Sequence, residues 1–338
     1  MTEMPKVLPE TPPASTDPLS DLLSSMRVAG MVLFRAEFRE PWAVITPDSC
    51  ELASTAPFRT EHIIPFHVIA SGACWLELPK REPVWLKDGD AVLLPYGDSH
   101  RLSGRDVATA VLVGELLPRL PWSDIALVEH GGIGATTSII CGFLKCDELL
   151  FHPILRHLPA LLHVSPDATP ADHWLATTIR HTATEASKPV PGSRSMLPRL
   201  TELMFVEILR KYMQGLSADE VGWFAAFNDP VAGAALKCLH AAPLEDWSVA
   251  SLAHRVGVSR TVLAGRFKHF LDQPPMQYLA HWRLQLAAQE LKTSDLPMKS
   301  IAEQAGYESE AAFSRAFKRH FGLPPADWRR RQGSMLME

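Results

Sequence analysis

The last ninety or so residues of the chain contain one sequence pattern twice, with the two copies about fifty residues apart. The matching positions are Leu252-Ala253, Gly257, Ser259, Phe267-Lys268 and Pro274-Pro275 in the first copy and Ile301-Ala302, Gly306, Ser309, Phe317-Lys318 and Pro324-Pro325 in the second. Each copy predicts a helix, a glycine-containing turn and a second helix, the arrangement that places one helix in the major groove of DNA. Two such units in tandem indicate contact with two successive grooves on one face of a duplex.

The ends of these helices are marked by local signals. Ser259 and Ser309 stand where a side-chain oxygen caps the start of the second helix of each copy. Gly257 and Gly306 stand in the turns, where a left-handed backbone is easiest without a side chain. Between the copies, residues 276–292 predict one helix, roughly 25 Å long at about 1.5 Å per residue. A spacer of that length can hold two recognition helices near the ~34 Å repeat of B-DNA.

The outward side of each second helix is expected to read bases. The predicted base-reading residues are Arg260, Thr261, Ala264 and Gly265 in the first copy and Glu310, Ala311, Ser314 and Arg315 in the second. Arg315 carries the paired donors that suit a guanine edge, and Thr261 suits a thymine methyl or a phosphate. The basic side chains expected at phosphates are Lys268, Lys318, Arg319 and Arg329. A helical bundle with solvated basic faces is the alternative, and the ordered duplication favours DNA binding over it.

Charge is distributed unevenly along the chain. Residues 246–331 contain 13 Lys and Arg against 8 Asp and Glu, a balance of +5. The remainder contains 20 against 30, a balance of −10, which together give the net charge of −5. A basic C-terminal module on an acidic body is expected when only that module meets a polyphosphate.

Composition also bears on the compartment. No run of eighteen apolar residues occurs, so no membrane span is expected. Five cysteines without the spacing of a disulfide framework favour a reducing, cytoplasmic environment. The proline-rich residues 1–18 lack the order of a secretion signal and predict a disordered leader.

The N-terminal half has a strand-rich pattern followed by helices. Short runs of aliphatic and aromatic residues, separated by turn signals, lie at 42–46, 66–69, 74–78, 91–94, 108–113 and 136–144. Strands at this spacing predict a small barrel or jelly roll. Helices are expected near 171–186 and 196–213, and the apolar stripe of the second consists of Leu200, Leu203, Val206, Leu209 and Tyr212. That stripe is compatible with burial inside the domain or with a contact between two subunits.

The C-terminal segment from about residue 229 to 331 resembles the DNA-binding domain of AraC/XylS-type transcription regulators. The resemblance is carried by Ile301-Ala302-Glu303-Gln304-Ala305-Gly306-Tyr307-Glu308-Ser309 and by Phe313-Ser314-Arg315-Ala316-Phe317-Lys318-Arg319. It implies base contacts at Thr261, Ala264 and Gly265 in the first copy and at Glu310, Ala311, Ser314 and Arg315 in the second. The small residues of the first copy favour shape and backbone contacts there. Promoter DNA and RNA polymerase are the partners that the resemblance implies.

The segment from Gly89 to His100 is similar to the second motif of cupin barrels, in which a strand leads through a proline-glycine turn to an inward histidine. Residues 66–69 and 72–76 resemble the earlier strands. The predicted fold class is therefore α+β: a cupin-like β-barrel with helices, then an all-α double helix-turn-helix domain. The predicted domains are a leader (1–18), a cupin-like effector or dimerisation domain (19–214), a linker (215–229) and the DNA-binding domain (230–331).

The residues expected to line an effector pocket are Trp42, His67, Trp75 and His100. Many cupins that hold a metal carry a His-x-His pair, whereas here His62 lies five residues before His67 and on the opposite face of a regular strand. Neither a metal nor another cofactor is therefore predicted. Cys141 and Cys146 invite a redox or metal interpretation, but their five-residue offset equally places them on opposite faces of a strand.

These observations predict a transcription regulator, not an enzyme, whose promoter binding responds to a small molecule sensed by the cupin-like domain, with a homodimer as the expected assembly. No nucleophile elbow, phosphate-binding glycine loop or His-Glu-x-x-His pair occurs in the sequence. Two alternatives stay open from the sequence: a metal-dependent cupin enzyme with an accessory DNA-binding domain, and a redox-responsive regulator.

Overall fold

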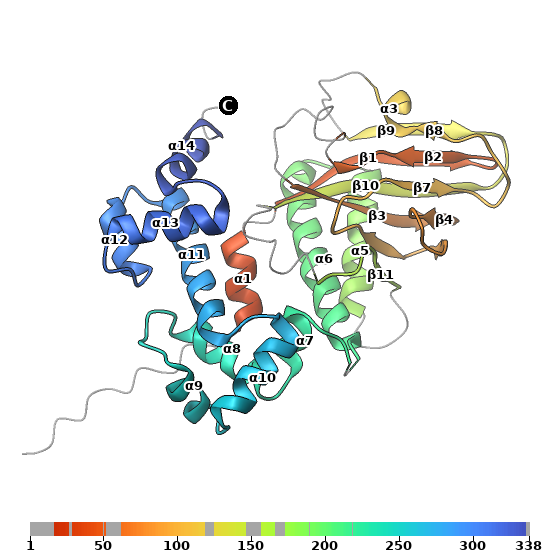
Figure 1. Ribbon diagram of the computed structural model, residues 1–338. Helices are drawn as coiled ribbons and strands as arrows, with labels where there is room; N and C mark the ends of the chain where they lie inside the picture. The colour runs from red at the N-terminus through yellow and green to blue at the C-terminus, as the bar shows by residue number, and fades with distance from the viewer. Residues whose placement is uncertain are drawn as a thin grey trace, which may run out of the picture. The chain divides into compact units, whose positions relative to one another are not determined.

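The computed structural model describes residues 17–26, 29–49, 51, 62–118, 125–146, 157–165, 173–188, 190–217 and 219–335 (Figure 1). These residues form two compact units. The N-terminal unit comprises residues 26–218, and the C-terminal unit comprises the chain from residue 219 onward together with residues 17–25. Most of the predicted leader, residues 1–16, lies outside the described residues. Among the described helices, none combines the length and apolar character needed to cross a bilayer.

Two mixed sheets build the N-terminal unit. The six-stranded sheet has the order β11 (Leu162–Val164), β6 (Ala91–Leu93), β3 (His62–Ser71), β10 (Thr136–Cys146), β1 (Ala29–Arg39) and β9 (Ala126–Gly131). The five-stranded sheet has the order β5 (Val84–Lys87), β4 (Ala73–Glu77), β7 (His100–Ser103), β2 (Ala43–Thr46) and β8 (Val111–Leu112), and the short helix α3 (Val113–Leu116) follows β8. Neighbouring strands run antiparallel except for β1 with β9 and β2 with β8.

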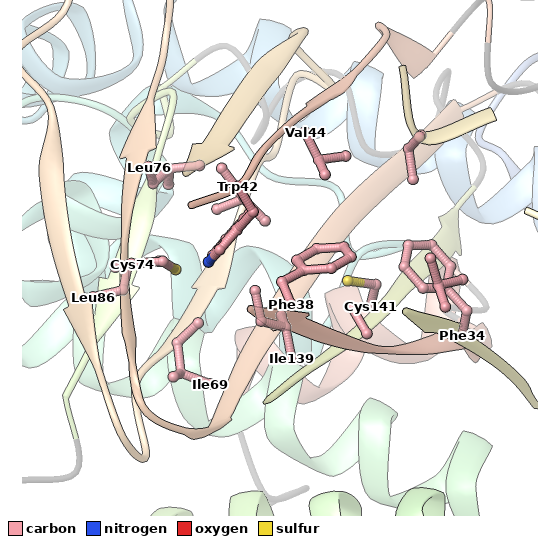
Figure 2. Close-up of a cluster of buried hydrophobic side chains, with 14 of the residues drawn as sticks. Phe34, Phe38, Trp42, Val44, Ile69, Cys74, Leu76, Leu86, Ile139 and Cys141 are labelled. Atoms are coloured by element: carbon pink, nitrogen blue, oxygen red, sulfur yellow. The ribbon is translucent and has the colours of Figure 1, made fainter. Parts of the chain in front are cut away.

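The longest strands form because their residues alternate between the core and the outer face. In β1, exposed or half-buried positions alternate with buried ones along the strand, because successive side chains point to opposite faces of the sheet. Phe34, Ala36 and Phe38 of β1 meet Leu76 and Leu86 of the other sheet, and Trp42 just before β2, in one apolar cluster (Figure 2). The two sheets therefore enclose a common core.

Helices cover the outer face of the six-stranded sheet. Helix α5 (His173–Ser187) packs against α6 (Ser193–Gly215), and both contact β1 (Figure 1). Of the predicted apolar stripe, Leu209 is buried, whereas Leu203 is 45% exposed. The face that α6 buries consists of Leu197, Thr201, Met204, Phe205, Ile208, Leu209 and Met213. The inward face is thus rotated from the predicted stripe.

The C-terminal unit is helical. Its helices are α7 (Trp223–Asn228), α8 (Ala232–Ala241), α9 (Val249–Arg255), α10 (Arg260–Leu271), α11 (Pro275–Thr293), α12 (Met298–Gln304), α13 (Glu310–Phe321) and α14 (Pro325–Met335). The predicted α+β class, a strand-rich domain with helices followed by an all-helical domain, is confirmed.

The structure differs from the predicted boundaries at both ends of the C-terminal unit. Helix α7 lies inside the segment predicted as a linker, because Trp223 and Phe224 bury their rings in this unit. Helix α1 (Pro18–Met26) contributes Leu19, which is buried, and Asp21, whose Oδ2 lies 3.8 Å from Nδ1 of His240 on α8. These contacts group the start of α1 with the helical unit, although the sequence prediction places it in the cupin-like domain.

Candidate nucleic-acid interface and the interior of the N-terminal unit

The first helix-turn-helix consists of α9 and α10. Ser248 and Ser251 form a capping box at the start of α9. Gly257 turns the chain at φ +74°, and the Ser259 side chain accepts a hydrogen bond from the Val262 amide at the start of α10. Leu263 and Phe267 of α10 are fully buried, which fixes the opposite side of the helix toward solvent.

The second helix-turn-helix, α12 and α13, repeats this construction. Gly306 turns the chain at φ +80°, and Ser309 accepts from the Ala312 amide at 3.2 Å. Phe313 and Phe317 are fully buried, in the positions that Leu263 and Phe267 hold in the first copy. Helix α11 joins the two copies and spans 19 residues, about 28 Å at about 1.5 Å per residue. The predicted turn, cap and spacer are each observed.

The predicted base-reading residues lie on the solvent side of α10 and α13. Seven of them are exposed, and Ser314 is half-buried. Val262, a bulky apolar residue 47% exposed on α10, shares this surface although it is not among the residues predicted to read bases. From the sequence, the outward direction of the Val262 side chain could be inferred only from its spacing relative to Leu263 and Phe267, which are buried.

The four cations predicted at phosphates have different surroundings. Lys318 and Arg319 are exposed on the last turn of α13. Lys268 is exposed on α10 and pairs with Asp272 one turn later. Arg329 on α14 is half-buried and donates from Nη2 to the Leu296 carbonyl at 2.7 Å, which engages its guanidinium in the packing of the unit.

Inside the N-terminal unit, two predicted pocket residues are in direct contact. The Nε2 atoms of His67 on β3 and His100 on β7 are 2.7 Å apart, and both side chains are buried. Nδ1 of His67 lies 3.2 Å from Sγ of Cys141 on β10, and Nδ1 of His100 lies 3.0 Å from the Asp98 carbonyl. The antiparallel pairing of β3 with β10 sets His67 opposite Cys141.

The proton positions in this series of hydrogen bonds can be deduced from the acceptor at its end, the Asp98 carbonyl. Because the Asp98 carbonyl can only accept, Nδ1 of His100 must carry a proton, so its Nε2 accepts when the ring is neutral. His67 then donates from Nε2 and accepts at Nδ1 from the Cys141 thiol. Burial lowers the pKa of His100 to about 4 and the pKa of His67 well below its usual value, and His100 adds to the latter effect. The network is therefore neutral near neutral pH.

The same geometry does not fit a metal centre of the cupin kind. Two imidazole nitrogens on one tetrahedral zinc ion lie roughly 3.3 Å apart at bond lengths of about 2.0 Å, whereas these two lie 2.7 Å apart and are aligned as a hydrogen bond. In the part of the chain that the structure describes, no three His, Cys, Asp or Glu side chains are arranged to hold a metal ion.

Among the described atoms, this hydrogen-bond network does not include Trp42 or Trp75. Trp42 is fully buried in the core (Figure 2). Trp75 is 37% exposed on the outer face of β4, where its ring stacks edge-on against Trp85 with centroids 4.8 Å apart. Cys146 ends β10, and its side chain lies outside the described atoms.

Burial leads to a prediction for thiol reactivity. Burial raises the pKa of Cys74 to about 12 and raises that of Cys141, so neither thiol supplies much of the reactive thiolate near neutral pH. Native protein treated with iodoacetamide should keep both cysteines unlabelled, whereas the half-buried Cys238 of the other unit should react before either of them. Peptide mass spectrometry with and without denaturant measures this order. Labelling of Cys141 in the folded protein as fast as Cys238 would contradict it.

Known proteins show the same two-part organisation. A family model described as Cupin matches residues 17–214, and one described as Helix-turn-helix domain matches residues 252–331. A protein of Streptomyces lividans described as an AraC-like transcription regulator is 33% identical over 93% of this chain and 98% of its own length. A protein of the same description from Streptomyces antibioticus is 32% identical over 93% of this chain and 98% of its own length. The transcriptional regulator AlkR of Acinetobacter baylyi is 30% identical over 78% of this chain and 86% of its own length.

The similarity covers both units, and the matched helix-turn-helix region contains α10 and α13 with their exposed polar faces. A helix-turn-helix domain of this type binds DNA. The chain therefore belongs to the AraC-like family of transcription regulators, with a cupin domain ahead of its helix-turn-helix domain.

Proposed function

We propose that this regulator reads a promoter through α10 and α13, which enter two successive major grooves of double-stranded DNA. The observation that carries the proposal is the matched construction of the two helices: each buries an apolar side and presents its predicted base-reading residues to solvent. The linker helix α11 connects them over a length close to one turn of B-DNA. Arg315, exposed on α13, is assigned to a guanine edge.

Phosphate neutralisation is assigned to Lys268, Lys318 and Arg319. All three are exposed beside the recognition surfaces. Their contribution is affinity without base preference, because a phosphate is the same at every base pair. Arg329 is assigned instead to holding α14 on the loop that contains Leu296.

The N-terminal unit is the proposed site of a small-molecule effector. Trp42 is fully buried, and its indole Nε1 has no hydrogen-bond partner among the described residues. A buried donor without a partner costs free energy, and an acceptor on an entering molecule would relieve that cost. We assign Trp42, His67 and His100 to an apolar effector that carries an acceptor group. Trp75 lies on the outer face and would contact an effector only there.

Effector binding regulates promoter occupancy only if the effector favours one state of the protein over another. RNA polymerase is the proposed partner at the promoter, and a homodimer is the proposed assembly.

Selection of DNA by the full chain tests the central proposal. The purified protein is mixed with a library of randomised duplexes, and bound duplexes are amplified and sequenced. We expect one preferred sequence with two segments about one helical turn apart, and an affinity that falls steeply as salt rises. Failure to enrich any sequence, with binding equal on all duplexes, would contradict sequence reading by this chain.

Arg315→Ala provides the residue-level test. Loss of a paired guanine contact should cost roughly 1–3 kcal/mol of binding free energy and relax one base position, because alanine offers no donor. Binding to the selected duplex and to its single-base variants is measured by titration. Lys318→Ala is the matched control and should weaken binding to all duplexes equally. An unchanged base preference in Arg315→Ala would remove Arg315 from the reading role.

A further inference from the structure

Arg283 lies near the middle of α11, the helix that joins the two helix-turn-helix units (Figure 1). Its guanidinium donates from Nε to the Pro243 carbonyl at 2.6 Å and from Nη2 to the Glu245 carbonyl at 2.9 Å. Both carbonyls belong to the segment between α8 and α9, which leads into the first helix-turn-helix unit. The Arg283 side chain of the linker helix is therefore hydrogen-bonded at two points to the segment that leads into the first helix-turn-helix.

The same guanidinium lies near Gly306, in the turn of the second helix-turn-helix. A Cβ placed on Gly306 would lie 2.9 Å from Nη1 of Arg283, so a side chain at this turn would displace the guanidinium. Burial raises the pKa of Tyr307, the residue after this turn, and the charges of Arg319 and Arg283 offset part of that rise. Within the C-terminal unit, Arg283 is thus packed between the segment that leads into the first helix-turn-helix and the turn of the second.

The first copy of the repeat lacks this contact. Gly257 holds the position of Gly306 and has a similar φ of +74° against +80°. A Cβ on Gly257 would meet no atom of the described residues within 4 Å. The backbone conformation therefore accounts for glycine at both positions, and the approach of Arg283 is specific to the second.

We propose that Arg283 is a positioning residue that fixes the two helix-turn-helix units relative to one another, and so sets the spacing of DNA segments that α10 and α13 can read together. This inference rests on the proposed function. A planar guanidinium serves two carbonyls and a third surface at once, whereas a lysine ammonium lacks that fixed geometry. Without Arg283 the units would be joined by α11 and its apolar packing, with the turns free to shift.

Spacing is the property that separates positioning from simple stabilisation. One base pair inserted between the two recognised segments moves them apart by about 3.4 Å and rotates one by about 35° around the duplex. A rigid pair of recognition helices cannot follow that change, whereas a loosened pair follows it in part. Loss of stability alone would weaken binding to every spacing by the same factor.

The experiment uses the full chain and the duplex that it selects from the randomised library, with and without a one-base-pair insertion between the two segments. For the unmodified chain we expect the insertion to weaken binding about 30-fold or more, the scale of losing one half of the contacts. Arg283→Ala should bind the selected duplex about 10-fold more weakly and should lose about 5-fold or less on insertion. Arg283→Lys should fall between the two proteins in its insertion penalty.

The glycine pair supplies a second, matched test. Gly306→Ala and Gly257→Ala both place a side chain on a left-handed backbone, but only Gly306→Ala displaces the guanidinium. Gly306→Ala should therefore reduce the insertion penalty as Arg283→Ala does, and the double variant should reduce it no further. Gly257→Ala should keep the penalty of the unmodified chain.

Two outcomes would overturn the inference: an insertion penalty in Arg283→Ala equal to that of the unmodified chain, or equal penalties in Gly306→Ala and Gly257→Ala. Failure of the unmodified chain to select any duplex would instead overturn the proposed function, together with the inference that rests on it.

Discussion

Replacing Phe317 by alanine should lower the free energy of unfolding of the C-terminal unit by about 3–5 kcal/mol. Phe317 is fully buried on α13. Its ring centroid lies 4.6 Å from that of Phe321, 5.5 Å from Phe313 and 5.7 Å from Trp328 on α14. Alanine leaves a cavity among three rings, and lost aromatic pairs add about 0.5–1.5 kcal/mol each to the loss of buried area. The loss should therefore approach the upper end of the range.

Phe267 is the matched position in the first copy of the repeat. It is also fully buried, with its ring centroid 6.1 Å from that of Tyr278. Phe267→Ala should destabilise the same unit by a smaller amount within the same range, because fewer rings surround it. Urea unfolding followed by pulse proteolysis, with fragments identified by mass, measures each unit separately. Val262→Ala, at an exposed position, is the control and should change stability by less than about 0.5 kcal/mol. A Phe317→Ala protein as stable as Val262→Ala would contradict this packing.

Local signals account for the features of the C-terminal unit that the sequence predicts well. Gly257 and Gly306 adopt the left-handed conformation, and Ser259 and Ser309 accept the capping hydrogen bonds. Each of these depends on residues within a few positions, and duplication shows the same signal twice. Helix α7 lies in the segment predicted as a linker (215–229), and the burial of Trp223 and Phe224 shows that this part of the segment belongs to the C-terminal unit.

Features that depend on pairing between residues far apart in the chain could not be predicted from the sequence. Strand β1 alternates regularly, yet the first strand expected from the sequence lies at 42–46, after β1 has ended. Cys141 was compared with Cys146, its neighbour in sequence, whereas its partner is His67 across the β3–β10 register. Trp75 and Trp42 are both large aromatic residues that could line an apolar pocket. Only the alternation of buried and exposed positions along β4 shows that Trp75 is directed outward. The hydrogen bond from Arg329 to the Leu296 carbonyl joins residues 33 positions apart, so the sequence around Arg329 does not indicate it.

The buried histidine pair predicts that acid destabilises the N-terminal unit. Burial lowers the pKa of His100 from 6.5 to about 4. Between pH 6.5 and pH 4, His100 is therefore protonated in the unfolded chain and neutral in the folded one. The stabilising contribution is therefore complete above about pH 6.5 and is lost as pH falls toward 4. At about 1.4 kcal/mol per pH unit, His100 alone accounts for a loss of about 3 kcal/mol. His67 acts in the same direction, because its pKa is also lowered.

Burial is the main cause of the lowered pKa of His100, and the direction of the hydrogen bonds acts in the same sense. His67 donates to His100, so a second proton on Nε2 of His100 would face the proton already on Nε2 of His67. His100→Gln keeps a polar side chain without a titrating group and should reduce the slope of stability against pH below 6.5. The pulse-proteolysis assay at several pH values resolves this slope for each unit. His240→Gln is the control, because burial lowers the pKa of His240 to about 3 in the C-terminal unit, and its replacement should alter the slope of that unit alone. An N-terminal unit equally stable at pH 4.5 and pH 7 would show that the pair accepts protons as readily folded as unfolded, and the neutral network would then be wrong.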